Sequence, residues 1–186
     1  MFYRPEDGHG LPHNPFNALI VPRPIGWIST RGKDGVDNLA PYSFFNGCAY
    51  VPPQVMFATT GVKPDRDGTK DSLANIRETG EFCVNMVARA MTDAMNASSA
   101  TLPAGQSEFD HAGLTRADCE TVACARVEGA PAALECRMTQ IVKIEGEANY
   151  VCFGTVTGMR IRGGCLVAGR VDVTRCTPRS RLGYRE

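Results

Sequence analysis

Short apolar or alternating runs, interrupted by Gly, Pro and Asp, recur along most of the chain. The clearest is NYVCFGTVTGMRI, residues 149–161, in which Val151 and Phe153 share one face and the small residues Gly154 and Gly158 share the other. Such alternation is typical of a β-strand, and a face of small residues allows another backbone to approach closely. The pattern predicts strands over residues 18–22, 25–30, 54–60, 81–87, 134–144, 149–161 and 165–172.

Two segments have helical spacing instead. In KDSLANIRETG, residues 70–80, Asp71 or Ser72 is the expected N-cap, two apolar residues fall on one face, and Gly80 is a stop signal. In RAMTDAMNASSA, residues 89–100, Ala and Met recur at helical spacing. The sequence therefore predicts two helices in the middle of a strand-rich chain.

These elements favour a mainly β protein of the β-rich α+β class. A segment rich in Gly, Pro and polar residues, 101–113, separates the helices from the second set of strands. No repeat or linker-like change of composition divides the chain, so we expect a single domain over residues 1–186. A closed or nearly closed antiparallel barrel would leave few exposed strand edges.

Charge excludes several classes of partner. The chain has 20 basic and 20 acidic residues and no block of Lys or Arg longer than a pair, so we expect neither nucleic acid nor a membrane surface as partner. The first ten residues lack the apolar stretch of a signal peptide, and no apolar run approaches the roughly 18 residues of a membrane helix. The composition predicts a soluble, cytoplasmic protein that acts on a small molecule or another protein.

The eight cysteines occur singly among apolar neighbours, with no C-x-x-C pair. Such cysteines are typical of reduced thiols that pack as small hydrophobic residues, so no metal site is predicted. The three histidines, His9, His13 and His111, lie outside the usual nucleophile motifs, and neither a Walker loop nor a G-x-G-x-x-G fingerprint is present. No catalytic residue is predicted.

Three polar patches remain as candidate binding residues. They are WISTRG (27–32), NLAPYSFFNG (38–47) and TKDS (69–72). Each has a simple structural interpretation when taken alone, as turn residues, core or helix cap. Together they supply hydroxyls, a lysine at a helix N-terminus and aromatic rings, which a phosphate monoester attached to a planar ring requires. The combination predicts a site for a flat phosphorylated cofactor.

With these residues in view, the sequence resembles the flavin reductase-like family, the FMN-binding split β-barrel group that includes flavoredoxin and NAD(P)H:FMN oxidoreductases. The matching segments cover nearly the whole chain, and the most specific are RPIGWIST, NLAPYSFFN and NIRETGEF. The resemblance implies a six-stranded Greek-key split barrel with flanking helices, a homodimer, and FMN in a groove near the subunit interface.

The resemblance also implies which residues contact the cofactor. Ser43 to Asn46 would line the isoalloxazine ring, and Lys70 and Ser72 would meet the phosphate. The full set implied in this way is Trp27, Ser29, Thr30, Ser43, Phe44, Phe45, Asn46, Lys70, Asp71 and Ser72. Departures from the family pattern include Ser72, where the family more often has threonine, and Ala49 and Val51 in place of polar residues.

By the same resemblance, the activity is reduction of flavin by NAD(P)H, with hydride transfer to flavin N5 and no obligatory protein acid or base. Phe109 and His111 are the candidates for the nicotinamide side of the site. The reduced flavin would serve a monooxygenase or another electron acceptor. Two other interpretations remain open: an FMN-binding electron-transfer protein of the flavoredoxin type without its own nicotinamide site, and a barrel-shaped dimer that binds no flavin. The choice between NADH and NADPH also remains open.

Overall fold

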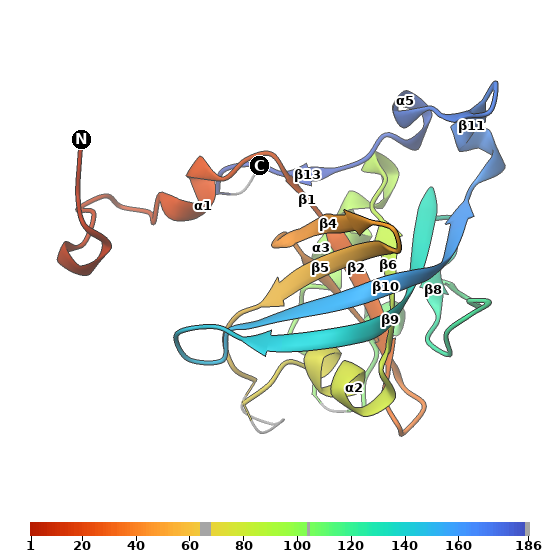
Figure 1. Ribbon diagram of the computed structural model, residues 1–186, viewed down its shortest axis with the longest axis horizontal. Coiled ribbons are helices and arrows are strands. Elements are labelled where there is room, and N and C mark those ends of the chain that lie inside the picture. The colour runs from red at the N-terminus through yellow and green to blue at the C-terminus, as the bar shows by residue number, and fades with distance from the viewer. Residues whose placement is uncertain (64–67, 104, 185–186) are drawn as a thin grey trace.

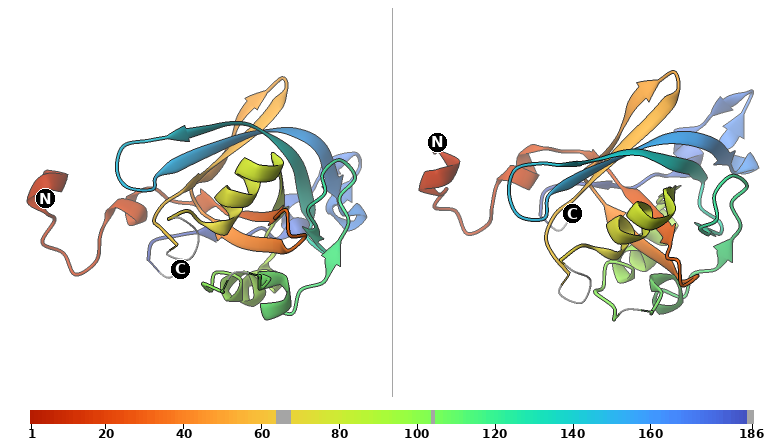
Figure 2. Two further views of the ribbon diagram at one scale, coloured as in Figure 1. Left: turned by 90° about the horizontal axis from the view of Figure 1, so that it is seen from below. Right: turned by 60° about the horizontal axis from the view of Figure 1, so that its bottom comes forward.

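A computed structural model describes residues 1–63, 68–103 and 105–184. Within those residues its largest element is a seven-stranded antiparallel sheet with strand order β3-β2-β6-β9-β10-β5-β4. Figures 1 and 2 show that this sheet curls round on itself, with α2 lying at its open end. The strands are β2 (Gly26–Arg31), β3 (Asp37–Tyr42), β4 (Phe45–Tyr50), β5 (Pro53–Thr59), β6 (Glu81–Met86), β9 (Ala132–Lys143) and β10 (Tyr150–Ile161).

Strands β3 and β4 lie at opposite ends of the strand order, although only Ser43 and Phe44 separate them in the sequence. The Ala58 amide of β5 donates to the Phe44 carbonyl at 2.8 Å, so the chain passes from one edge of the sheet to the other at this point. The mainly β, split-barrel class is confirmed. The described residues form seven strands in this sheet rather than six because the stretch 37–50 is interrupted.

Shorter elements surround the barrel. Two-stranded ribbons join β1 (Arg23–Pro24) to β13 (Ser180–Arg181), β7 (Arg116–Ala117) to β8 (Arg126–Val127), and β11 (Leu166–Val167) to β12 (Arg170–Val171). The helices are α1 (Phe16–Leu19), α2 (Asp71–Thr79), α3 (Thr92–Ala97), α4 (Glu108–His111) and α5 (Val173–Cys176), with 3-10 turns at Pro5–Asp7, Arg89–Met91 and Gly163–Cys165. In Figure 1 the N-terminal segment extends away from the barrel, and β13 runs beside β1.

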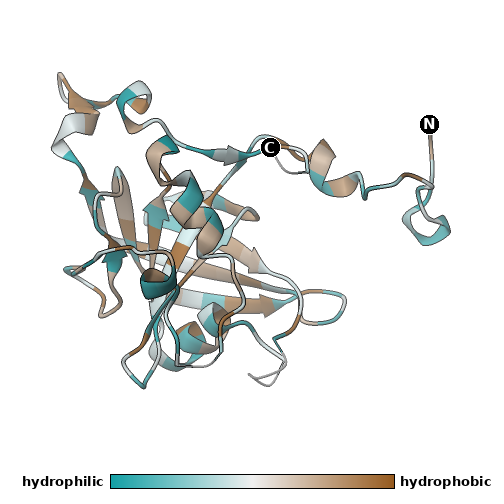
Figure 3. Cartoon of the chain, turned by 180° about the vertical axis from the view of Figure 1, so that it is seen from behind, coloured by the Kyte–Doolittle hydropathy of each residue, from teal (hydrophilic) through white to brown (hydrophobic). Residues whose placement is uncertain are grey.

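The inside of the barrel is apolar. Phe57 packs between Tyr42 and Phe82, with ring centroids 4.9 and 5.6 Å away, and Ile28 belongs to the same buried cluster. A Cβ built on Gly154 would lie 2.5 Å from the Phe82 ring, so the small residue predicted at this strand position is required by close packing. Figure 3 shows hydrophobic residues concentrated on the barrel strands and hydrophilic ones in loops such as the N-terminal turn.

A second core lies outside the barrel, between β2 and β3 on one side and α3 and α4 on the other. Trp27, Leu39 and Phe109 are fully buried there, next to Val87 and Met95. Successive residues of β2 therefore serve two cores, because Ile28 points into the barrel and Trp27 away from it. The views in Figure 2 place α3 and α4 on the side of β2 and β3 away from α2.

The structure corrects part of the predicted element pattern. The strand predicted over 18–22 is absent: α1 ends at Leu19, and Leu19 is 77 % exposed, so no packing surface favours an extended run there. The strand predicted over 165–172 is a turn followed by the β11–β12 hairpin, which reverses at Ala168 and Gly169, both with positive φ. Strands β3 and β4 and helix α4 were not predicted.

The helix predicted over 70–80 is α2, and Gly80 ends it in the left-handed conformation, with its amide bonded to the Ile76 carbonyl. The helix predicted over 89–100 is a 3-10 turn followed by α3. All eight cysteines lie in the described residues and are free thiols, six of them buried. Among the described residues, no helix combines the length and hydropathy needed to cross a membrane.

Candidate functional site

A cavity of about 340 Å³ opens between β3, the start of α2 and the segment that follows α3. Its volume lies in the range of roughly 300 to 1,000 Å³ that is typical of small-molecule sites. The lining residues are Asn38, Ala40, Pro41, Tyr42, Val62, Lys63, Lys70, Asp71, Ser72, Ser98, Ser99, Ala100, Thr101, Leu102 and Glu108. Two segments far apart in the sequence therefore close over one strand of the barrel.

The N-terminus of α2 forms one wall of the cavity. Its N-cap residue is Lys70, in extended conformation, rather than Asp71 or Ser72, and the Lys70 side chain supplies no capping oxygen. Because a helix N-terminus carries unsatisfied N–H groups and a partial positive charge, it attracts anions. Lys70, Asp71 and Ser72 all line the cavity, so the third sequence patch is brought together at this wall.

Charged and aromatic groups surround this wall. Lys63 Nζ lies 2.5 Å from Asp71 Oδ2, which fixes the first turn of the helix to the preceding segment. Lys70 Nζ lies 5.8 Å from the centroid of the Tyr42 ring, within the range of a cation–π contact. Burial raises the pKa of Tyr42 to about 12, so this phenol is neutral at physiological pH. The wall therefore combines a lysine with a neutral aromatic ring.

A buried hydrogen-bond network supports the floor. Ser72 Oγ donates to Asn38 Oδ1 at 2.8 Å, and Asn38 Nδ2 donates to Glu108 Oε2 at 2.7 Å. The same Glu108 oxygen accepts from the Leu39 amide at 2.9 Å. Charge-assisted bonds of this kind hold a buried carboxylate in one orientation. The network ties α2, β3 and α4 to one another, and three of its members line the cavity.

The first sequence patch lies behind the wall rather than on it. Thr30 is fully buried; its hydroxyl donates to Asn38 Oδ1 at 3.4 Å. Trp27 is also fully buried in the outer core, and its indole Nε1 donates to Ser98 Oγ at 2.8 Å. Ser29 lies on β2 beside β6, and its hydroxyl accepts from Asn85 Nδ2 at 3.2 Å. Trp27 and Thr30 each form a hydrogen bond with a residue that lines the cavity, whereas the hydrogen bonds of Ser29 go to Cys83 and Asn85, which do not line it.

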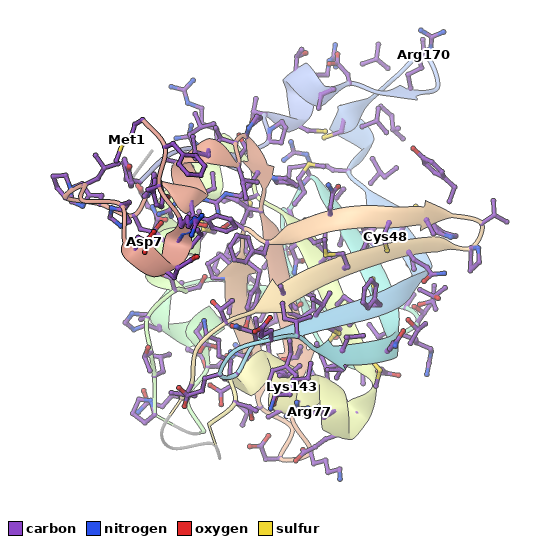
Figure 4. All side chains as sticks on the ribbon, turned by 60° about the vertical axis from the view of Figure 1, so that its left-hand side comes forward. Met1, Asp7, Cys48, Arg77, Lys143 and Arg170 are labelled. Atoms are coloured by element: carbon purple, nitrogen blue, oxygen red, sulfur yellow. The ribbon has the colours of Figure 1, made fainter. Side chains whose placement is uncertain are left out.

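The second patch is divided. Ser43 lies beside the cavity wall, accepting from Arg23 Nη1 at 3.0 Å, and Phe44 lies 5.5 Å from the same guanidinium. Phe45 packs against the barrel core, and Asn46 is exposed on β4, where its carboxamide accepts from the Gly47 amide. None of these four is among the lining residues of the 340 Å³ cavity. Figure 4 shows the neighbouring Cys48 on the same projecting hairpin.

The candidates for the nicotinamide side are also separated from the cavity. Phe109 is fully buried in the outer core, with the Arg116 guanidinium 5.0 Å from its ring centroid. His111 ends α4 and is exposed, lining a groove of about 730 Å³ with Arg116 and Asp110. The two residues therefore face different surroundings although they belong to one short helix.

Sequence reasoning did not single out several residues that line the cavity: Asn38, Tyr42, Lys63, Ser98 and Glu108. Asn38 and Tyr42 belong to the patch 38–47, which was predicted to bind the ligand. Their place in that patch was the signal that could have identified them as lining residues. Ser98 and Glu108 gave no local signal, because only the packing of α3 and α4 against β2 and β3 brings them to the cavity.

The cavity contains groups that suit the predicted ligand. A helix N-terminus with Lys70 and Ser72 provides donors for a phosphate, and the cavity extends from them along the Tyr42 ring. The residues present thus fit a phosphorylated planar molecule held in a barrel protein.

Comparison with known proteins identifies the family. The family model for the flavin reductase like domain matches residues 18–171. A protein of Deinococcus radiodurans is 43 % identical over 177 residues, which cover 90 % of this chain and 75 % of the relative. The chain therefore belongs to the flavin reductase-like family.

Solved structures support the same assignment. Nitrilotriacetate monooxygenase component B from Bacillus cereus is 28 % identical, with a TM-score of 0.86 over 96 % of this chain and 95 % of that one. Flavoredoxin of Desulfovibrio vulgaris (Miyazaki F) shares the fold, with a TM-score of 0.78 over 90 % and 86 % of the two chains at 20 % identity. Family and fold together support a flavin cofactor and a flavin-related oxidoreductase or electron-transfer role.

Proposed function

We propose that this protein is an FMN-dependent oxidoreductase that reduces its flavin with NAD(P)H. The observation that carries the proposal is the wall formed by Lys70, Ser72 and the N-terminus of α2, open to a cavity beside the Tyr42 ring. One phosphate suits this wall, and a monophosphate distinguishes FMN from flavins that carry none or two. When bound, FMN supplies the redox chemistry, accepting a hydride at N5 and passing electrons onward.

In this proposal the residues of the chain bind FMN and orient its ring. Lys70 pairs with the phosphate, and the N–H groups of the first turn of α2 donate to the same group, while the Ser72 hydroxyl donates to Asn38 and holds that turn in place. Ser98 lines the cavity from the segment after α3, with Trp27 holding it in place, and Glu108 belongs to the network of the floor. The role proposed for Thr30 is support of the wall through Asn38, and the role proposed for Ser29 is to hold β2 against β6 through its bond with Asn85.

The ring end of the flavin is proposed to extend toward residues 43–46. Ser43 and Pro41 line a hollow of about 570 Å³ that shares Pro41 and Ser99 with the cavity. Backbone donors near Ser43 to Asn46 would then lie close to the ring. The nicotinamide is proposed to stack on the ring in the same hollow. The groove at His111 shares no lining residue with that hollow, and Phe109 packs in the outer core, so neither is proposed to contact the nicotinamide ring.

The test begins with an absorbance spectrum of purified protein after addition of FMN, followed by anaerobic NADH or NADPH. We expect flavin bands that bleach with one or both nucleotides, and NAD(P)H oxidation that depends on FMN. A yellow protein whose bands persist with either nucleotide would favour the flavoredoxin-type carrier. A colourless protein that does not quench FMN fluorescence would contradict flavin binding altogether.

We further propose that the reduced flavin serves a separate acceptor, because the B. cereus structure with the 0.86 TM-score is a monooxygenase component. A homodimer is part of the same proposal. Tyr50 and Val51, at the tip of the β4–β5 hairpin, are each 95 % exposed and would be covered by a second copy. Light scattering coupled to gel filtration tests this, and a mass of one chain, 20.1 kDa, would contradict it.

A further inference from the structure

A groove with an unusual charge lies where the N-terminal segment meets the C-terminal strand. It has a volume of about 850 Å³, and Figure 1 shows its elements, α1, β1 and β13, close together. Its lining residues are Pro12, His13, Asn14, Asn17, Arg23, Ser43, Arg181, Gly183 and Tyr184. The rings of His13 and Tyr184, with centroids 5.3 Å apart, join its two sides. No residue of this lining, all of it within the described ranges, is acidic.

Two arginines of the lining, Arg23 and Arg181, lie opposite each other on the β1–β13 ribbon. Arg23 and Arg181 are direct partners in the β1–β13 ladder, an arrangement in which side chains project to the same side. Arg23 is only 6 % exposed, and its Nε is buried with no hydrogen-bond partner. Arg181 donates to the Tyr184 carbonyl. Within residues 1–63, 68–103 and 105–184, no carboxylate lies within 4.0 Å of either guanidinium.

Such an arrangement is costly without an anion. Like charges placed opposite each other destabilise a ladder, and a buried cation without a counter-ion loses hydration without compensation. Burial, and secondly the charge of Arg181, lower the pKa of the Arg23 guanidinium. The remaining donors of the groove, on Asn14, Asn17 and His13, suit an anion as well.

We propose that Arg23 and Arg181 form a second anion site, which binds the phosphate or diphosphate group of a small molecule. Two guanidinium forks match the several oxygens of such a group, and together their charge matches a dianion. Ser43, already bonded to Arg23, presents its hydroxyl to the same groove.

The position of the groove indicates what the small molecule does. The 570 Å³ hollow shares Ser43 and Arg181 with this groove, and it shares Pro41 and Ser99 with the 340 Å³ cavity. A phosphorylated molecule held by the arginines can therefore reach toward the cavity. This step rests on the proposed function: the anion site holds the charged end of the second substrate, while the cavity holds the flavin.

The probe for the site is pyrophosphate, measured by isothermal titration at low ionic strength. Arg181 is exposed, so Arg181→Gln removes one fork with little risk to folding, and thermal unfolding checks this. We expect Arg181→Gln to weaken pyrophosphate binding by about tenfold or more, because the loss of one charged hydrogen bond raises the dissociation constant about tenfold. The matched control is Arg170→Gln, an exposed arginine on the distant β11–β12 ribbon (Figure 4), which should bind like the wild type.

Lys70→Ala separates the two anion sites, because pyrophosphate could also reach α2. Binding that survives Lys70→Ala and falls with Arg181→Gln supports the proposal. Binding that falls only with Lys70→Ala, no binding by the wild type, or tighter binding of succinate than of pyrophosphate would overturn it. FMN titration of the same proteins is a separate readout: failure to bind FMN would contradict the proposed function and leave the pyrophosphate result to decide this site.

Discussion

The cavity beside α2 and the arginine groove both present cations, but they differ in how those cations are partnered. In the cavity, Lys63 pairs with Asp71, and Glu108 is held by Asn38 and the Leu39 amide. In the groove, the Arg23 guanidinium has the Ser43 hydroxyl and the Phe44 ring as neighbours, its Nε has no hydrogen-bond partner, and no carboxylate of the described residues pairs with it. A wall whose charged groups are already paired can be preorganised for a ligand. Two neighbouring arginines without a counter-ion, by contrast, are stabilised most when an anion binds between them.

The largest expected effect is the loss of FMN affinity when the lysine of the cavity wall is removed. Lys70→Ala should weaken FMN binding by about 1.5 to 3 kcal/mol, because a charged hydrogen bond to the phosphate is lost. Fluorescence quenching of FMN measures the change, and Lys33→Ala, at an exposed turn lysine, is the control. Pyrophosphate binding in the arginine groove should not change. Equal FMN affinity for Lys70→Ala and the wild type would remove Lys70 from the site.

The next effect tests whether the network makes the cavity rigid. Asn38→Ala removes the partner of both Ser72 and Glu108. Among the described residues, Glu108 Oε2 then keeps only its hydrogen bond from the Leu39 amide. The free energy of unfolding should fall by about 1 to 3 kcal/mol, the cost of unsatisfied buried polar groups. Urea unfolding measures it. Asn96→Ala, at an exposed position of α3, is the control, and an equal loss in both variants would contradict a special role for Asn38.

Alkaline pH tests the burial of the ring beside Lys70. The pKa of Tyr42 is raised from 10.0 to about 12 by burial, so the folded state keeps the proton that the unfolded state releases. Stability from this group is therefore full below pH 10 and falls as pH rises from about 10 to 12. At pH 11, which is one pH unit above the unfolded-state pKa, the loss is about 1.4 kcal/mol. Urea unfolding of wild type and Tyr42→Phe at pH 9 and 11 measures it, and the same alkaline loss in both would contradict the assignment.

Local patterns predicted the parts of the fold that local physics determines. The helix 70–80 was predicted because its apolar pair and Gly80 act within a few residues, and the long strand 149–161 because its alternation is undisturbed. Strands β3 and β4 escaped prediction because Pro41 and the polar residues of 38–47 hide the alternation, and their pairing with β2 and β5 is non-local.

The residues of the candidate site also differ in whether local sequence or tertiary packing brings them to the cavity. Lys70 and Ser72 were predicted to meet a phosphate because a helix N-terminus is a local feature, and both line the cavity. Glu108 and Ser98 reach it only through tertiary packing, so no sequence window contains them with β3. Trp27 shows the limit most clearly: the family resemblance implied that it contacts the cofactor, whereas strand alternation turns its ring into the outer core.

The smallest expected effect distinguishes contact from support. Thr30 is fully buried behind Asn38, and its hydroxyl also accepts from Asn75 Nδ2 at 3.1 Å. Thr30→Ala should therefore weaken FMN binding by only about 0.5 to 1.5 kcal/mol, through loss of a neutral hydrogen bond that positions Asn38. Thr30→Ser keeps the hydroxyl and should restore the affinity, whereas a direct steric role for the methyl group would not be restored. If Thr30→Ala leaves the FMN affinity unchanged and lowers the thermal stability, Thr30 stabilises the barrel and takes no part in FMN binding. That result would sharpen the contrast with Lys70, because Lys70→Ala should lower the FMN affinity without changing the stability.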